Sequence, residues 1–249
     1  MKFSKLGGYL DRLEKTSSRL EITGILTELF KETNASEIQK TVYLVLGVLA
    51  PNYEGVLLNL AEKMVIRAIA LAYDRNVEMV TKLYKEKGDV GNTAQELSKL
   101  VVHRSTFTVL EVYERLLAIA KDNGEGSQDR KIEKMADLLK NLDPLSARFV
   151  ARIPVGRLRL GFSEKTVIDA LAGHDAKIQK EIESAYNIRP DIGYVAKLVK
   201  EGNLRSAKPQ IGIPVVPMLA ARLNSVTEMI KKMGEVSVEP KFDGLRIFI

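Results

Sequence analysis

The residues with the clearest chemical potential stand near the end of the chain, where charged side chains interrupt an alternating apolar run over residues 238–249. Glu239, Lys241 and Asp243 are spaced two apart within this strand-like run. Alternate residues of a β-strand share one face, so these three side chains would point into one cavity. Gly244 follows them and would let the chain turn closely beneath a bulky ligand.

Lys241 is predicted to be a catalytic nucleophile. A lysine amine attacks only in its neutral form, which burial among apolar residues or a neighbouring cation favours by lowering its pKa. The apolar strand would supply the burial, and Arg246 would supply the cation. The competing interpretation is a β-hairpin with Asp243 and Gly244 at its turn and exposed charges around it. Spacing alone favours this hairpin.

A long series of helices is expected to precede this segment. Over roughly the first 185 residues, apolar side chains recur at helical spacing, which predicts a mainly α, multi-helix domain. Residues 56–73 are so apolar that we expect one long buried helix there. Thr106 is expected to cap a helix over residues 107–120.

Prolines mark the boundary between two expected domains. Pro209, Pro214 and Pro217 fall among β-branched residues, a composition that indicates an extended linker. We therefore expect a helical domain over residues 1–208. The linker and a short β-containing segment would occupy residues 209–249.

The composition excludes several classes of site. The chain of 249 residues has no cysteine and two histidines. Disulfides, thiolate zinc sites and cysteine catalysis are therefore excluded, and no metal ligand is predicted. No apolar run approaches the roughly 20 residues that span a bilayer, and no signal-peptide core follows the N-terminus. We expect a cytoplasmic protein with no membrane partner.

The distribution of positive charge indicates a polyanionic partner. The formal net charge is +6, and residues 145–165 carry five cations against one acid. Arg152, Arg157 and Arg159 are expected at a turn, from which guanidinium groups bind phosphates or enter a minor groove. A solvated basic face is an equally good interpretation of this count.

A glycine-rich turn over residues 123–127 is a second candidate for a phosphate contact. Gly126 and Ser127 would open a helix, whose free N–H groups and dipole attract anions. The same composition also suits an ordinary loop.

Residues 239–246 read E-x-K-x-D-G-x-R. This run resembles the nucleotidyl-transfer motif of ATP-dependent DNA ligases, RNA ligases and capping enzymes. Four further segments resemble elements of the archaeal and eukaryotic replicative type of DNA ligase, in that family's order, so the likeness covers essentially the whole chain. They are residues 88–91, residues 124–127 with Lys131, residues 152–161 with Thr166 and Val167, and residues 214–220.

The resemblance implies a fold and a set of partners. Residues 1–208 would form a helical DNA-binding domain that grips nicked duplex DNA through the minor groove. Residues 209–249 would begin an adenylation (nucleotidyltransferase) domain. Apart from the resemblance, we expect a monomer that is nucleoid-associated if prokaryotic, and a sliding clamp is considered as a further partner. The DNA contacts would include Gly126, Ser127, Lys131, Arg152, Arg157 and Arg159.

The resemblance also implies a reaction with ATP and Mg²⁺. Lys241 would attack the α-phosphorus of ATP to form lysyl-AMP. AMP would pass to the 5′-phosphate at the nick, and the 3′-hydroxyl would then displace it. Glu239 would recognise adenosine, and Arg246 would contact the ribose or a phosphate. Asp243 and Gly244 would shape the turn beneath the nucleotide.

The later motifs of that family would lie beyond Ile249, so we expect this chain to be a fragment that binds DNA and does not ligate. Two alternatives stay open. The first is a non-catalytic DNA-binding module in which the K-x-D-G run is accidental. The second is a helical scaffold for protein partners, against which a steep loss of DNA affinity with added salt would argue.

Overall fold

The computed structural model describes residues 1–249 except 102–105, 157, 159, 174, 218–221, 241–243 and 245–249. The chain forms two compact units, Met1–Val216 and Pro217–Ile249. The prediction of a mainly α fold is confirmed, because helices supply the regular structure of the described residues. None of the described helices is long and apolar enough to cross a membrane.

The described part of the first unit contains twelve α-helices and two short 3₁₀ helices. The α-helices are α1 (Phe3–Glu14), α2 (Arg19–Glu32), α3 (Ile38–Leu46), α4 (Glu62–Ala72), α5 (Val77–Lys87), α6 (Val90–Ser98), α7 (Val109–Ala120), α8 (Ser127–Lys140), α9 (Pro144–Arg152), α10 (Glu164–Ala172), α11 (Ala176–Ile188) and α12 (Ile192–Lys200). The 3₁₀ helices are η1 (Asn52–Glu54) and η2 (Leu204–Ser206).

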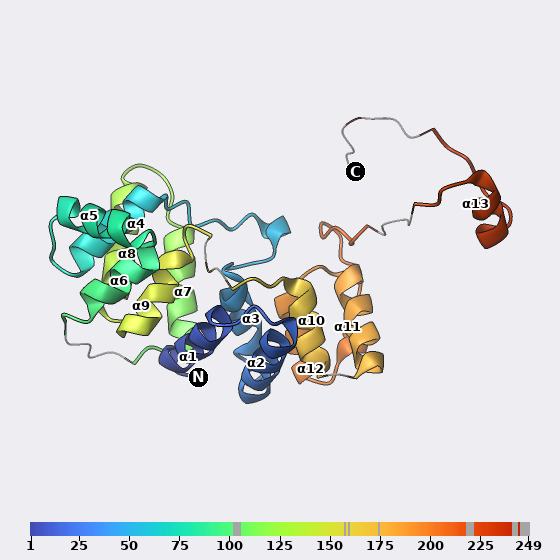
Figure 1. Cartoon of the computed structure of the whole chain (residues 1–249), viewed down its shortest axis with the longest axis horizontal. Coiled ribbons are helices and arrows are strands. Elements are labelled where there is room, and N and C mark those ends of the chain that lie inside the picture. The colour runs from blue at the N-terminus through green and yellow to red at the C-terminus, as the bar shows by residue number, and fades with distance from the viewer. Residues whose placement is uncertain are drawn as a thin grey trace. The chain divides into compact units, whose positions relative to one another are not determined.

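The helices of this unit form two groups (Figure 1). In one group α6 packs on α9 and α4 packs on α8, with α5 and α7 beside them. In the other group α3 packs on α12, α2 packs on α10, and α11 lies against α10 and α12. Helix α1 contacts α9 in the first group and α2 in the second, so it joins the two groups.

The apolar stripe of α1 explains how it makes both contacts. Phe3, Leu6, Leu10 and Leu13 recur at helical spacing, and each is at most 2% exposed. Burial of one such side chain is worth roughly 1.5–3 kcal/mol relative to exposure, which outweighs the weak propensity of a short helix to form alone.

The prediction of one long helix over residues 56–73 is wrong in its first part. Helix α4 begins only at Glu62, after an irregular segment over residues 55–61. Gly55 and Asn59 have φ values of 62° and 51°, a left-handed conformation that interrupts a right-handed helix. Exposure alternates in this segment, since Leu58 is buried and Leu57 is 65% exposed. An extended segment that buries alternate residues can therefore have the same apolar content as a buried helix.

The predicted cap of α7 is misplaced by two residues. Thr108, rather than Thr106, is the N-cap, and its side chain accepts a hydrogen bond from the Glu111 N–H. The Glu111 carboxylate accepts a hydrogen bond from the Thr108 N–H at 2.7 Å, which completes a capping box. Both threonines suit an N-cap by composition, and only Thr108 has a glutamate three positions later.

The linker is attached to the first unit as far as Val216. The Val216 N–H donates to the Asn187 carbonyl at 3.0 Å. The Arg189 guanidinium donates to the Gln210 side chain at 3.1 Å. The division between the two units therefore follows Val216. The assignment of residues 209–249 to a second functional domain stays a prediction.

The described part of the second unit contains one helix, α13 (Val226–Met233), and no strand. The expected strand is not seen in residues 235–240, because a β-strand exists only through hydrogen bonds to a partner strand. Lys241, Asp243 and Arg246 lie outside the described residues.

Candidate nucleic-acid interface

The α7–α8 turn presents exposed glycines at the start of a helix. Gly124 and Gly126 have φ values of 85° and 70°, which glycine adopts without steric cost. Both are exposed, and Ser127, the first residue of α8, is half-buried. Gly126 occupies the N-cap position and has no side chain to cap α8. The positive end of the α8 dipole therefore has no capping side chain, and the one acidic residue in the first turn of α8 is Asp129.

Lys131 does not share this exposure. Its residue is 4% exposed, and its Nζ donates to the Leu58 carbonyl at 3.0 Å. One helical turn into α8, the side chain lies against the extended 55–61 segment rather than towards solvent. The expected role of Lys131 in binding DNA is corrected to a structural one, because its ammonium already satisfies a buried carbonyl.

The α5–α6 corner contains residues 88–91, one of the segments singled out in the sequence. Gly88 follows α5 as its C-cap, and its φ of 66° reverses the chain. Asp89 then caps α6 by accepting a hydrogen bond from the Asn92 N–H at 2.8 Å. A side chain on Gly91 would meet Arg148 and Arg152, so this glycine lets α6 and α9 pack closely.

The Arg152 side chain lies inside the protein. Arg152 is the last residue of α9, directly before the turn of residues 153–156, and its side chain is 1% exposed. Its Nε donates to the Asp89 carboxylate at 2.9 Å, and its guanidinium also pairs with Glu14 at 3.0 Å. The expectation that Arg152 contacts DNA is corrected, since both acids hold its guanidinium between α1, α6 and α9.

Arg148, one turn earlier on α9, belongs to the same buried cluster. It forms ion pairs with Asp11 at 3.4 Å and with Glu14. Burial lowers the pKa of Arg148, and the neighbouring Arg152 adds to that effect. Two of the five cations of residues 145–165 are thus compensated within the fold. Arg157 and Arg159, which are also among the five, lie outside the described residues.

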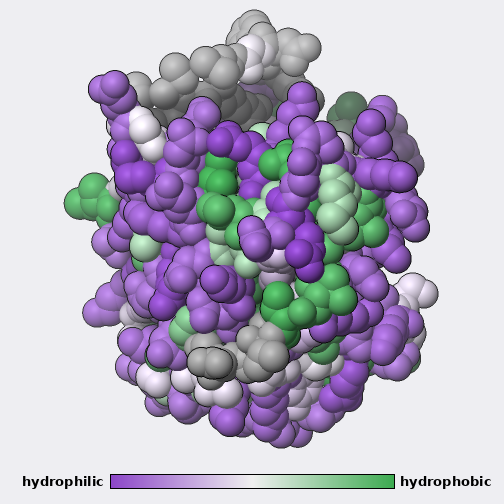
Figure 2. Space-filling model, turned by 90° about the vertical axis from the view of Figure 1, so that its left-hand side faces the viewer, coloured by the Kyte–Doolittle hydropathy of each residue, from purple (hydrophilic) through white to green (hydrophobic). Residues whose placement is uncertain are grey.

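Contacts connect three of the segments singled out in the sequence. The α5–α6 corner is bonded to the end of α9 through Asp89. Residues 153–156, which follow α9, share a small cleft with residues 55–58. That segment in turn accepts the hydrogen bond from α8. The left-hand side of Figure 1, where α4, α5 and α6 lie, is mainly hydrophilic with smaller hydrophobic patches (Figure 2).

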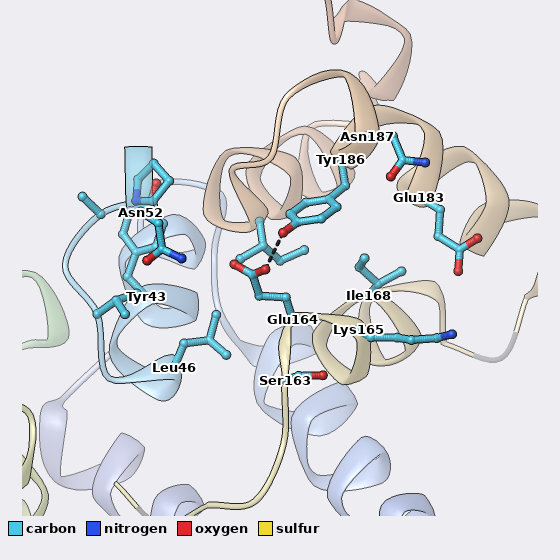
Figure 3. Close-up of a pocket in the computed structure, with 14 residues that line it drawn as sticks. Tyr43, Leu46, Asn52, Ser163, Glu164, Lys165, Ile168, Glu183, Tyr186 and Asn187 are labelled. Carbon is cyan, nitrogen blue, oxygen red and sulfur yellow. Dashed lines mark hydrogen bonds between the residues drawn. The ribbon is translucent and has the colours of Figure 1, made fainter. Parts of the chain in front are cut away.

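A separate cleft of about 690 Å³ lies between the end of α3, η1 and the helices α10 and α11. Glu164 and Tyr186 point towards one another within it, and the tyrosine donates a hydrogen bond to the carboxylate (Figure 3). Burial, with the hydrogen bond to Glu164, raises the pKa of Tyr186. Lys165 also lines the cleft, but Glu164 and Glu183 outnumber it. This charge balance disfavours a polyphosphate or a nucleic acid.

The expected nucleotide site is described only in part. Glu239 and Gly244 are exposed, while Lys241, Asp243 and Arg246 lie outside the described residues. Within the described ranges no group of three or more histidine, aspartate or glutamate side chains could hold a metal ion. The predictions for these five residues therefore stay predictions.

Asp122 and Arg130 together organise the α7–α8 turn, and neither residue was predicted from the sequence. Asp122 accepts hydrogen bonds from Arg130 and Lys134, each at 2.6 Å. A signal was present in the sequence, because the acid directly precedes the glycine turn and the two cations are spaced i, i+4 on the helix that follows.

Comparison with known proteins gives matches over nearly the whole chain. Residues 2–172 match the family model described as DNA ligase N terminus. The chain is 40% identical to a probable DNA ligase of Dictyoglomus turgidum and 41% identical to DNA ligase 2 of Thermofilum pendens, in both cases over 99% of its length. It is 40% identical to a DNA ligase of Saccharolobus solfataricus, again over 99% of its length. The chain spans 43–44% of the length of these relatives.

Proposed function

This chain belongs to the DNA ligase family, and from that premise we propose that it supplies the DNA-binding part of an ATP-dependent enzyme that seals nicks in duplex DNA. The observation that carries the proposal is similarity to DNA ligases over 99% of the chain. A match of that extent includes the E-x-K-x-D-G-x-R run as well as the helical unit. Nick sealing needs both parts, a grip on DNA and a nucleophile that carries AMP.

In this proposal the first unit binds the sugar-phosphate backbone on both sides of the nick. The exposed turn at Gly124 and Gly126 supports the proposal, since it offers backbone N–H groups beside the positive end of α8. Backbone contacts position a protein on DNA without reading its sequence. We therefore expect little base preference and a strong dependence of the affinity on salt concentration.

The proposed chemistry begins at Lys241. Its neutral amine attacks the α-phosphorus of ATP, a P–N bond forms, the bond to pyrophosphate breaks, and the amine loses a proton. AMP then passes to the 5′-phosphate at the nick, and the 3′-hydroxyl displaces it to form the phosphodiester. Glu239 and Arg246 are proposed to hold the adenosine and the ribose or a phosphate. Asp243 and Gly244 are proposed to form the turn beneath the nucleotide.

Magnesium is proposed to accompany ATP, and it would offset the negative charge of the phosphates. We assign it no ligand in this chain, since the described residues include no suitable cluster of carboxylates or histidines.

Binding of the 249-residue chain to a nicked duplex with a 5′-phosphate tests the first part of the proposal. Fluorescence anisotropy at a series of salt concentrations should give an affinity that falls steeply as salt rises, with little change when the sequence of the duplex is altered. An affinity independent of salt, or no binding to duplex DNA at low salt, would contradict it.

Transfer of label from α-labelled ATP tests the second part, in the full-length protein with and without the Lys241→Ala substitution. We expect the variant to lose adenylation and to keep nick binding. A variant that still becomes adenylated would exclude Lys241 as the nucleophile and leave the non-catalytic DNA-binding module as the better interpretation.

A further inference from the structure

Arg130 folds back over the α7–α8 turn instead of extending into solvent. Its guanidinium donates to the Glu125 carbonyl at 2.8 Å and to the Asn123 carbonyl at 3.2 Å. Its Nε and a second nitrogen donate to the Asp122 carboxylate. A guanidinium has five N–H donors, and these bonds engage most of them within the protein. Arg130 is therefore poorly disposed to bind a phosphate directly, although its side chain is 45% exposed.

Asp122 fixes the position of that guanidinium. Its side chain is 7% exposed and also accepts a hydrogen bond from Lys134. Asp122 comes two residues after the end of α7, where the negative end of the helix dipole disfavours a carboxylate. The two cations compensate for this location, and they hold Arg130 at the turn.

Because the peptide bond is planar, the orientation of each carbonyl group also fixes the orientation of the N–H group of the next residue. In a trans peptide the carbonyl of one residue and the N–H of the next point in opposite directions, and the described residues include no cis peptide. Because the Asn123 carbonyl faces Arg130, the Gly124 N–H faces away from it. The Glu125 carbonyl likewise directs the Gly126 N–H away from the guanidinium.

These two N–H groups have no acceptor among the described residues, and both glycines are exposed. The N–H groups of Gly124 and Gly126 are separated by that of Glu125, and backbone N–H groups of a turn that point to one side form a concave anion site. The N-terminus of α8 adds its positive dipole at the same place.

We propose that Arg130 is a positioning residue for DNA binding. By holding the carbonyl groups of the turn, it presents the N–H groups of Gly124 and Gly126 to a backbone phosphate of duplex DNA. This inference rests on the proposed function, because it assigns a task to a residue at the proposed DNA interface.

Asp122→Asn separates this role from a purely electrostatic one. The substitution removes a negative charge, so long-range attraction alone would tighten DNA binding. The amide keeps one acceptor oxygen but no charge, so it holds Arg130 at the turn more weakly, and we expect the affinity for a nicked duplex to fall about tenfold at a fixed salt concentration. The two interpretations therefore predict changes of opposite sign.

Substitutions at Arg130 and Lys134 form the matched set. Arg130→Gln and Lys134→Gln each remove one cation from the same carboxylate, but only Arg130 holds the turn carbonyls. We expect Arg130→Gln to weaken binding about tenfold and Lys134→Gln about two- to threefold. Arg130→Lys keeps the charge but lacks the planar fork, so its affinity should fall almost as far as that of Arg130→Gln.

A second measurement needs no substitution. In the wild-type chain, amide NMR signals of Gly124 and Gly126 should shift downfield when nicked duplex is added. Tighter binding by Asp122→Asn, equal losses for Arg130→Gln and Lys134→Gln, or unmoved glycine amides would each overturn the inference. If the wild-type chain binds DNA and one of these contradicting results is found, only the positioning role of Arg130 is excluded. If the wild-type chain does not bind DNA, the proposed function fails together with it.

Discussion

The role of Arg152 in the structure differs from the role predicted from the sequence. Beside Arg157 and Arg159 it belongs to a basic run, yet its guanidinium is bonded to Asp89 and Glu14, which lie 63 and 138 residues away in the chain. Because both partners are far from Arg152 in the sequence, neither ion pair produces a pattern within a short stretch of sequence. An arginine in a basic run therefore predicts a phosphate contact only if no acid from a distant segment reaches it first.

The Arg152→Met substitution should destabilise the first unit strongly. The substitution removes the guanidinium that pairs with the buried Asp89 carboxylate, and breaking a buried ion pair costs about 3–5 kcal/mol. Urea unfolding monitored by circular dichroism measures the change. Lys99→Met is the control, since its pair with Glu96 is about half exposed on each side and is worth at most about 1 kcal/mol. Equal stabilities of the two variants would contradict the structural role of Arg152.

The Asp122 carboxyl should titrate well below an ordinary aspartate. The hydrogen bonds from Arg130 and then from Lys134 lower its pKa from 3.8 to about 2. Because the pKa in the folded state is depressed, the contribution of Asp122 to stability is complete above about pH 4 and is lost as the pH falls through about 2. NMR titration of the carboxyl carbon should show this midpoint, and Arg130→Gln should raise it. A wild-type midpoint near 4 would rule out the bonded turn.

At the scale of the elements, apolar spacing predicts that helices form, but it does not fix where each helix begins and ends or how closely two helices pack. Helical spacing predicted most of the helical content but placed residues 56–61 in a helix, because an extended segment buries alternate apolar residues too. Asn59 has a positive φ, which asparagine adopts more readily than most residues, so a local signal for the break was present that helical spacing does not register.

Thr108→Ala should cost about 1 kcal/mol of unfolding free energy, because α7 loses the side chain that caps its first turn. Thr106→Ala should change the stability by less than about 0.5 kcal/mol, since the exposed Thr106 caps no helix. Thermal unfolding of the two variants distinguishes the positions. The reverse order of the two effects would favour the start of α7 predicted from the sequence.

Two glycine substitutions should have opposite effects. In Gly91→Ala the new Cβ would lie 2.5 Å from the Arg148 carbonyl oxygen, so α6 must move away from α9 at a cost of about 1–3 kcal/mol. In Gly24→Ala the new Cβ meets no atom within 4 Å inside the exposed part of α2, and the gain should be about 0.5–1 kcal/mol. Urea midpoints that move in the same direction would contradict the packing of α6 on α9.

At the scale of the whole molecule, the first unit extends past the boundary expected from the prolines. The hydrogen bonds of Gln210 and Val216 attach the linker to α11 and the residue that follows it. Proline composition identifies an extended segment, but it contains no information about which unit the segment lies against.

Chains ending at residue 216 and at residue 208 test this boundary. The first should unfold at the same urea concentration as the 249-residue chain, because Pro217–Ile249 forms a separate unit. The second loses two hydrogen bonds to the linker and should be less stable by about 1 kcal/mol. Equal midpoints for the two truncated chains would place the end of the first unit at residue 208.

The sequence by itself determined the mainly α class, the family likeness and the glycine turns, because helical spacing, short motifs and positive φ are local properties. It also predicted the run around Lys241, whose chemistry awaits the adenylation experiment. Only the tertiary structure decided which cations are available to a ligand. Arg152 and Lys131 are satisfied by Asp89 and by the Leu58 carbonyl, which lie far from them in the chain. Such pairing arises when helices pack, so no local pattern of charge contains it.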